Sequence, residues 1–236
     1  MAIYIIIIII ITVVYILHKY LNRNINDNFT NSEGKHLEYV HIPKNAGTSI
    51  ENLGNRFGIK WGRFNTNYGS TCDKCNYYIW HTPCFRMDDN VDYFTTIRNP
   101  YDRIISEFYY VNGGKLKRGE LGEDKHINIF YKWFDEAIEK YNKNDTAYGC
   151  HLMPQSNYVY DGGNQRIKHL IYMDKDMNTN LQNLFNEYNL KIDVNEFENN
   201  NTTKKEFNKK DLCRECLNKI YNFYRIDFDN FGYDKL

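Results

Sequence analysis

The sequence lacks an excess of either charge. Its 236 residues include 30 lysines and arginines and 30 aspartates and glutamates, so the formal net charge at pH 7 is +0. This balance excludes a nucleic-acid-binding protein that is recognisable from its global charge. Apolar residues are not scarce, since 42% of the chain is hydrophobic and 25% is charged, which excludes a wholly disordered protein. A chain of this length buries a core without staples, and we expect one globular domain.

The features of a cleaved signal peptide are also lacking. Residues 2–17 are uncharged and almost wholly apolar, but no basic region precedes them and no A-x-A site follows. A helix of about 20 residues is about 30 Å long, the thickness of the apolar core of a bilayer. We therefore expect residues 1–21 to be a retained transmembrane signal-anchor. Residues 22–36 are polar and aperiodic, and we expect them to form a short stalk.

From residue 37 onwards, strand-like and helix-like segments alternate, and no internal repeat interrupts them. The expected strands are residues 37–42, 77–80, 93–97 and 167–173. The expected helices are residues 48–57, 99–111, 127–141, 178–188 and 209–223. Asparagine and two glycines at 112–114 are expected to end the second helix. This alternation predicts an α/β domain over residues 37–236, with a P-loop-like central parallel sheet flanked by helices.

The first chemical motif joins the first expected strand to the first expected helix. It consists of Pro43, Lys44, Asn45, Ala46, Gly47, Thr48 and Ser49. Such a junction offers an anion unpaired N–H groups, the positive end of a helix dipole and, here, a mobile lysine. The order G-x-x-x-x-G-K-[ST] and a Walker B aspartate are missing, which argues against a magnesium-dependent ATPase. The alternative is a plain helix start, capped by Thr48 and completed by Glu51 as a capping box.

A second motif runs from Thr95 to Ser106. Arg98 stands at the C-terminal end of a strand, where open α/β sheets bind ligands. Asn99 and Pro100 are suited to cap and begin the next helix. We expect Arg98 and Ser106 to converge on one phosphate group, with the arginine forming a charge-assisted contact. The alternative is a surface arginine and a helix serine without a joint role.

Together the two motifs resemble the sulfotransferases that use 3′-phosphoadenosine 5′-phosphosulfate (PAPS), and most of all the membrane-anchored Golgi carbohydrate sulfotransferases of the heparan sulfate 2-O and 6-O types. The resemblance implies that residues 43–49 bind the 5′-phosphosulfate end of PAPS and that Arg98 and Ser106 bind its 3′-phosphate. It continues weakly through residues 153–158 and 171–173, and it returns in residues 221–233. It therefore covers most of residues 37–236.

The resemblance also implies a reaction without a metal, in which PAPS donates a sulfuryl group to a hydroxyl of a carbohydrate. In-line transfer needs a base for the acceptor proton and a positive group at the leaving phosphate. Lys44 is suited to the leaving phosphate. His81 is suited to be the base, because it follows an expected strand between the two motifs, as the catalytic histidine does in the 2-O and 6-O types. The alternative is a structural His81 that bonds a backbone carbonyl.

Other candidates for the base are weaker. Some relatives use a glutamate on the helix after the phosphate loop, where this chain has Leu53. His41 is expected to be structural. His126 and His151 are kept as lesser candidates. A rival function stays open as well: a catalytically inactive, membrane-anchored protein that binds a glycan or another partner on the same fold.

The cysteines and the flanks of the apolar segment bear on location. Two C-x-x-C pairs, Cys72/Cys75 and Cys213/Cys216, are compatible with a zinc site, a disulfide or free thiols. Basic residues at 18, 19 and 23 would keep the C-terminal flank of the anchor cytoplasmic. Sequons at residues 28, 144, 200 and 201 and the resemblance favour the opposite orientation. We expect a single-pass type II protein with its domain in the Golgi or an equivalent secretory lumen.

Overall fold

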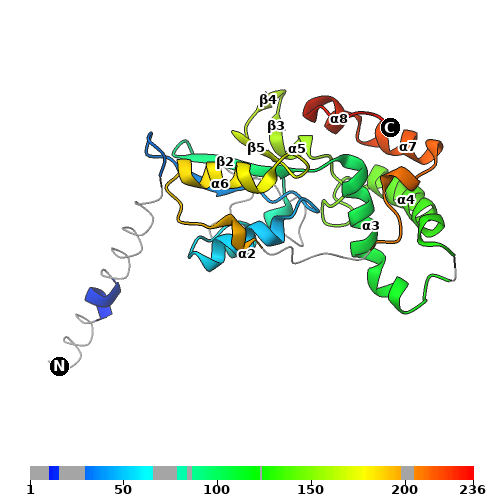
Figure 1. Cartoon of the computed structure of the whole chain (residues 1–236), viewed down its shortest axis with the longest axis horizontal. Coiled ribbons are helices and arrows are strands. Elements are labelled where there is room, and N and C mark those ends of the chain that lie inside the picture. Colours follow the sequence, from blue (N-terminus) through cyan, green and yellow to red (C-terminus); the bar gives the residue numbers. More distant parts are fainter. Residues whose placement is uncertain (1–10, 16–29, 66–78, 84–86, 123, 198–204) are drawn as a thin grey trace.

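The structure is a computed structural model that describes residues 11–15, 30–65, 79–83, 87–122, 124–197 and 205–236 (Figure 1). Its centre is a three-stranded parallel sheet in the order β1–β2–β5. These strands are His36–Tyr39, Val91–Ile97 and His169–Tyr172. The middle strand is buried without a break from Asp92 to Ile97, as in parallel sheets that are covered on both faces. The expected α/β class with a central parallel sheet is confirmed.

Each face of the sheet has its own apolar cluster. Phe94 packs with side chains of α2 (Gly47–Arg56) and α6 (Met177–Glu187) on one face. Its neighbour in the strand, Tyr93, points to the other face and packs with residues 150–159, which end in α5 (Ser156–Val159). Alternate residues of a strand point to opposite faces, so this one strand joins both clusters.

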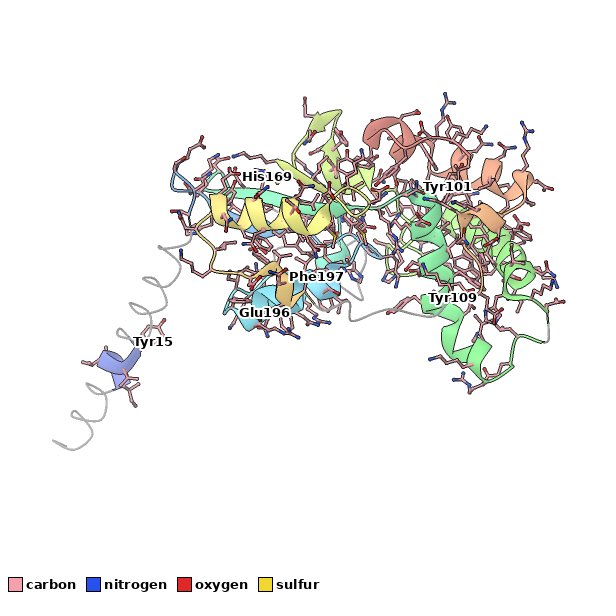
Figure 2. All side chains as sticks on the ribbon, viewed as in Figure 1. Tyr15, Tyr101, Tyr109, His169, Glu196 and Phe197 are labelled. Atoms are coloured by element: carbon pink, nitrogen blue, oxygen red, sulfur yellow. The ribbon has the colours of Figure 1, made fainter. Side chains whose placement is uncertain are left out.

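A third cluster lies among the helices that Figure 1 shows beyond one end of the sheet. These helices are α3 (Pro100–Lys117), α4 (His126–Lys143), α7 (Arg214–Phe223) and α8 (Arg225–Phe231). Two buried tyrosines of α3, Tyr101 and Tyr109, are labelled in Figure 2. The smaller elements are η1 (Gly62–Phe64), η2 (Ile79–His81), β3 (Tyr160–Asp161), β4 (Asn164–Gln165), η3 (Val194–Glu196) and η4 (Lys209–Asp211).

Two sequence-based expectations about these elements are wrong. The helix that was expected to end at residues 112–114 continues to Lys117. The side chain of Asn112 donates to the carbonyl of Phe108 at 3.1 Å, and Leu116 packs on the helical cluster, so tertiary contacts outweigh the helix cost of the two glycines, about 1 kcal/mol each. The expected strand over residues 77–80 is a 3₁₀ helix, η2, where it is described. Residues 77 and 78 lie outside the described residues.

The expected anchor and stalk are described only in part. Residues 11–15 are helical and exposed, and from residue 30 the chain leads into β1. No helix in these described ranges has the length and apolarity needed to cross a membrane. Residues 1–10 and 16–29 lie outside the described residues, so the anchor stays a prediction.

Candidate functional site

The loop before α2 has an unusual backbone. Lys44 and Ala46 both adopt the left-handed conformation, with φ of 69° and 63°, although neither is a glycine. Ala46 is the N-cap of α2, and no side chain caps the helix. The backbone N–H groups of Ala46, Gly47 and Thr48 donate no hydrogen bond within the described part of the chain. Such a turn at a helix N-terminus is an anion-binding concavity.

The alternative for this loop, a capping box of Thr48 and Glu51, is wrong, because Glu51 has other partners. Its carboxylate is fully buried and lies 2.7 Å from Nδ1 of His41. It also accepts the backbone N–H of Arg63 at 3.1 Å. The His41 ring packs so closely on Gly47 that a Cβ there would lie 2.4 Å from the ring. His41 is thus a support of the loop, and the requirement for Gly47 is set by this ring.

The two sequence motifs are joined directly. The guanidinium of Arg98 donates to the carbonyl of Lys44 at 2.8 Å, and that of Arg103 donates to the carbonyl of Pro43 at 3.0 Å. Arg103 is 1% exposed, although the sequence did not predict that it is buried. The start of α3 follows the expectation, since the Asn99 side chain accepts the N–H of Tyr101 and Pro100 is the first helical residue. Both arginines therefore hold the loop from the second motif.

Gln155 holds the same junction from a third segment. Its Oε1 accepts hydrogen bonds from the Asn45 side chain at 2.6 Å and from the backbone N–H of Arg98 at 3.0 Å. Its Nε2 donates to the Arg98 carbonyl at 2.9 Å. The buried carboxylate of Asp227 in α8 in turn accepts the N–H groups of Gln155 and Ser156. The segments around residues 155 and 227 thus fix the geometry of the two motifs.

Two cations at this junction lack an acidic partner. Neither Lys44 nor Arg98 forms an ion pair within the described residues. Nζ of Lys44 lies 4.0 Å from the ring centre of Tyr110 in α3. Burial lowers the pKa of Lys44 to about 8, with Arg98 and Arg103 acting in the same direction and Glu107 opposing them. Burial likewise lowers the pKa of Arg98. An anionic ligand would relieve this shortage of negative charge.

Lys205 is a further cation that the sequence did not reveal. Burial and the charges of Arg98 and Lys44 lower its pKa to about 8, while Asp102 opposes them. Ser106 is a half-buried residue of α3 whose hydroxyl makes no hydrogen bond within the described ranges. It lies three residues after Arg103 and four before Tyr110, so it shares the helix face that turns toward the loop. Joint action of Ser106 and Arg98 on one phosphate stays a prediction.

His81 lies in a cluster of three histidine rings. Its ring centre is 4.6 Å from that of His41 and 4.9 Å from that of His151. All three residues are buried. Burial strongly lowers the pKa of His81, and the charges of His41, His151 and Lys44 act in the same direction. His81 is therefore neutral at neutral pH, with a ring lone pair, and it lies within electrostatic range of Lys44. Its carbonyl accepts the hydroxyl of Tyr158 at 2.8 Å.

The state of three of the cysteines is given by the structure. Cys150, which is in neither C-x-x-C pair, is buried and disulfide-bonded. Cys213 and Cys216 are free thiols, at the start of α7. Cys72 and Cys75 lie outside the described residues. Among the residues that are described, no three histidine, cysteine or acidic side chains are grouped to hold a metal ion.

Several residues that contact the two motifs were not identified from the sequence, although the motifs themselves were. Glu107 and Lys205 belong to no pattern that marks them as functional, and Gln155 lies in residues 153–158, where the resemblance is weak. His126, kept as a lesser candidate, lies elsewhere, 3.3 Å from Glu206. A family model described as "Sulfotransferase family" matches residues 27–234, a range that contains every residue of the site. Searches of the curated proteins and of the solved structures found no match.

Proposed function

Because the chain belongs to the sulfotransferase family, we propose that it transfers a sulfuryl group from PAPS to a hydroxyl group of a carbohydrate. Membership by itself supports sulfuryl transfer to a hydroxyl-bearing acceptor. The donor, the class of acceptor and the roles of single residues are part of the proposal. The observation that carries it is the direct bond between the motifs, in which Arg98 donates to the Lys44 carbonyl at 2.8 Å.

The charges of the site support a donor with phosphate at both ends. The unpaired N–H groups before α2 and the Lys44 side chain suit the 5′-phosphosulfate, and residues 43–49 are proposed to bind it. Arg98 keeps donors beyond the one that it gives to Lys44, and with Ser106 it is proposed to bind the 3′-phosphate. Lys205 adds a positive charge near Arg98. The anion then supplies the ion pairs that these cations do not form within the described residues.

In the proposed reaction the acceptor oxygen attacks sulfur as the bond from sulfur to the phosphate oxygen breaks. The bond electrons stay on the phosphate, where Lys44 and the N-terminus of α2 stabilise them. The acceptor proton passes to a ring nitrogen of His81. Burial lowers the pKa of His81, so this imidazole is neutral before the reaction and has a ring lone pair, while its charged form is disfavoured. No residue in this account requires a metal.

We also propose that the chain is a single-pass type II membrane protein whose domain lies in the Golgi or an equivalent secretory lumen. The disulfide at Cys150 supports this location, because disulfides persist in oxidising compartments. Asn144, the one sequon asparagine within the described residues, is exposed at the end of α4, where a glycan can be attached. Residues 1–21 are the proposed anchor.

The test is transfer of labelled sulfate from PAPS to a panel of glycans by the full chain. We expect Lys44→Ala to lower turnover by about 10²-fold or more, since it removes charge stabilisation of the leaving group. His81→Ala is expected to lower turnover by about 10²-fold or more by removing the base. Arg98→Ala is expected to weaken donor binding first. Lys132→Ala, which changes an exposed lysine of α4, is the control.

Two results would contradict this proposal. Unchanged turnover in His81→Ala moves the base to another residue. Binding of PAPS or a glycan without any transfer by the unmodified chain favours the rival function, an inactive binding protein on the same fold.

A further inference from the structure

Glu107 is a buried carboxylate in the middle of α3 that has no role in the proposed reaction. It is 1% exposed, and its Oε2 lies 2.8 Å from Nδ1 of His151. An ionised carboxylate only accepts hydrogen bonds, so Nδ1 of His151 carries the hydrogen. Its other oxygen, Oε1, is buried and accepts no hydrogen bond within the described residues. His151 is thus the single polar partner of this carboxylate in the described part of the chain.

The pair differs from the second buried glutamate–histidine pair, Glu51 with His41. Glu51 is also 3.4 Å from the guanidinium of Arg63 and accepts the Arg63 N–H, so its charge is balanced without the histidine. Glu107 forms no ion pair with an arginine or lysine within the described residues, although its charge raises the pKa of Lys44. A buried carboxylate is stabilised by positive charge beside it, and the ring of His151 is the group that bonds Glu107 directly.

His151 is also well placed relative to the proposed reaction. Its ring stacks on Tyr110, with ring centres 5.3 Å apart and an angle of 23°, and Lys44 lies over that same tyrosine. Its ring is 4.9 Å from the ring of His81. The His151 carbonyl accepts a hydrogen bond from Arg103, which also holds Pro43. His151 is therefore held by side chains of α3 next to the proposed base.

We propose that His151 accepts the proton from His81 and that Glu107 assists it. Glu107 fixes the ring of His151 so that Nε2 of His151 is the proton acceptor. The inference rests on the proposed function and deepens it. Nε2 of His151 makes no hydrogen bond within the described residues and is not fully buried, so it is available. Both residues are positioning residues, because they act through His81.

Each bond that breaks in the proposed proton transfer is matched by a bond that forms. The acceptor O–H bond breaks as its oxygen bonds to sulfur, and the proton forms an N–H bond on His81. That N–H bond then breaks as the proton passes to Nε2 of His151. The positive charge on His151 is neutralised by Glu107, while the released phosphate keeps the electron pair of the broken S–O bond. The charged form of His81, which burial disfavours, then does not accumulate, because the proton passes on to His151.

The first measurement needs no variant. Nitrogen NMR of the full chain, labelled at its 7 histidines, reports which ring nitrogen of each neutral histidine carries hydrogen. We expect the Nδ1–H form for His151, identified by the loss of its signals in His151→Gln. The Nε2–H form in the unmodified chain would overturn the proposal, whether or not Glu107→Gln folds.

The second measurement compares Glu107→Gln with Glu206→Gln. The first variant keeps the shape of the buried side chain and removes its charge. The second makes the same change in the exposed His126–Glu206 pair, 57% exposed at the glutamate, and is the matched control. For Glu107→Gln we expect a mixture of ring forms at His151 and a fall in turnover of about 10²-fold, with unchanged affinity for desulfated PAPS.

Turnover of folded Glu107→Gln equal to that of Glu206→Gln would overturn the proposal. A failure of the proposed function looks different: the unmodified chain then neither binds desulfated PAPS nor transfers sulfate. The histidine NMR on that same sample still decides whether Glu107 fixes the ring of His151.

Discussion

Replacement of Gln155 by methionine tests whether one buried amide holds both phosphate motifs. The Gln155 side chain is 0% exposed and joins Asn45 to both backbone groups of Arg98. Methionine has nearly the same length and volume, so Gln155→Met removes the hydrogen bonds without opening a cavity. The change therefore isolates the polar contacts from the packing.

The size of the effect follows from the groups that lose a partner. Asn45 keeps a second acceptor, the Thr96 carbonyl at 2.6 Å, and contributes little. The N–H and carbonyl of Arg98 lose the partner that Gln155 provided, at about 1–3 kcal/mol each, which predicts a loss of about 2–6 kcal/mol in the free energy of unfolding. A misplaced Arg98 is expected to weaken binding of desulfated PAPS about tenfold or more.

Denaturant unfolding measures the first quantity and calorimetric titration the second, on the full chain. The matched control is Gln182→Met in α6, where the amide bonds the Val194 N–H and the Ile192 carbonyl, both at 3.0 Å. This amide is half-buried, so water replaces part of the loss, and a smaller fall in stability with unchanged donor affinity is expected. Equal donor affinity in Gln155→Met and Gln182→Met would refute the role of Gln155 as the link between the motifs.

Two further predictions concern the phosphate loop. Lys44 has a pKa of about 8, and a bound anion raises it. Affinity for desulfated PAPS is therefore present below pH 8 and falls as pH rises above it, by about tenfold per pH unit for each proton taken up. Titrations from pH 7 to 9 measure this dependence, and the same slope in Lys44→Arg would contradict it. Gly47→Ala places a Cβ 2.4 Å from the buried His41 ring and is expected to cost about 1–3 kcal/mol. Gly113→Ala, where a Cβ meets nothing within 4 Å, is expected to be neutral or stabilising, so equal stability of the two variants would contradict the clash.

Local chemistry made part of the fold predictable. The pair Asn99–Pro100 starts α3 as expected, because capping and the fixed φ of proline act within one turn. The apolar stripe in residues 127–141 also forms the expected helix, α4, with Phe130 and Phe134 in the core. These signals depend on neighbours a few residues apart.

Expectations failed where a distant residue competed for the same group. Glu51 had the spacing of a capping box but is taken by His41 and Arg63. The glycines at 113 and 114 had the composition of a helix end but lie in a helix held by the core. A local rule states only what a segment does when nothing else binds it.

The sequence by itself determined the class of fold, the two motifs that are proposed to bind the donor and their order, because each is written in adjacent residues. Only the tertiary structure decided that Gln155, 110 positions from Asn45, links these motifs, and that Glu107 meets His151 across 44 positions. Such pairs form because the sheet and α3 bring buried polar groups within reach of one another, and a buried polar group must find a partner wherever the packing places it. That placement is a property of the packed core and is not encoded in the spacing along the chain.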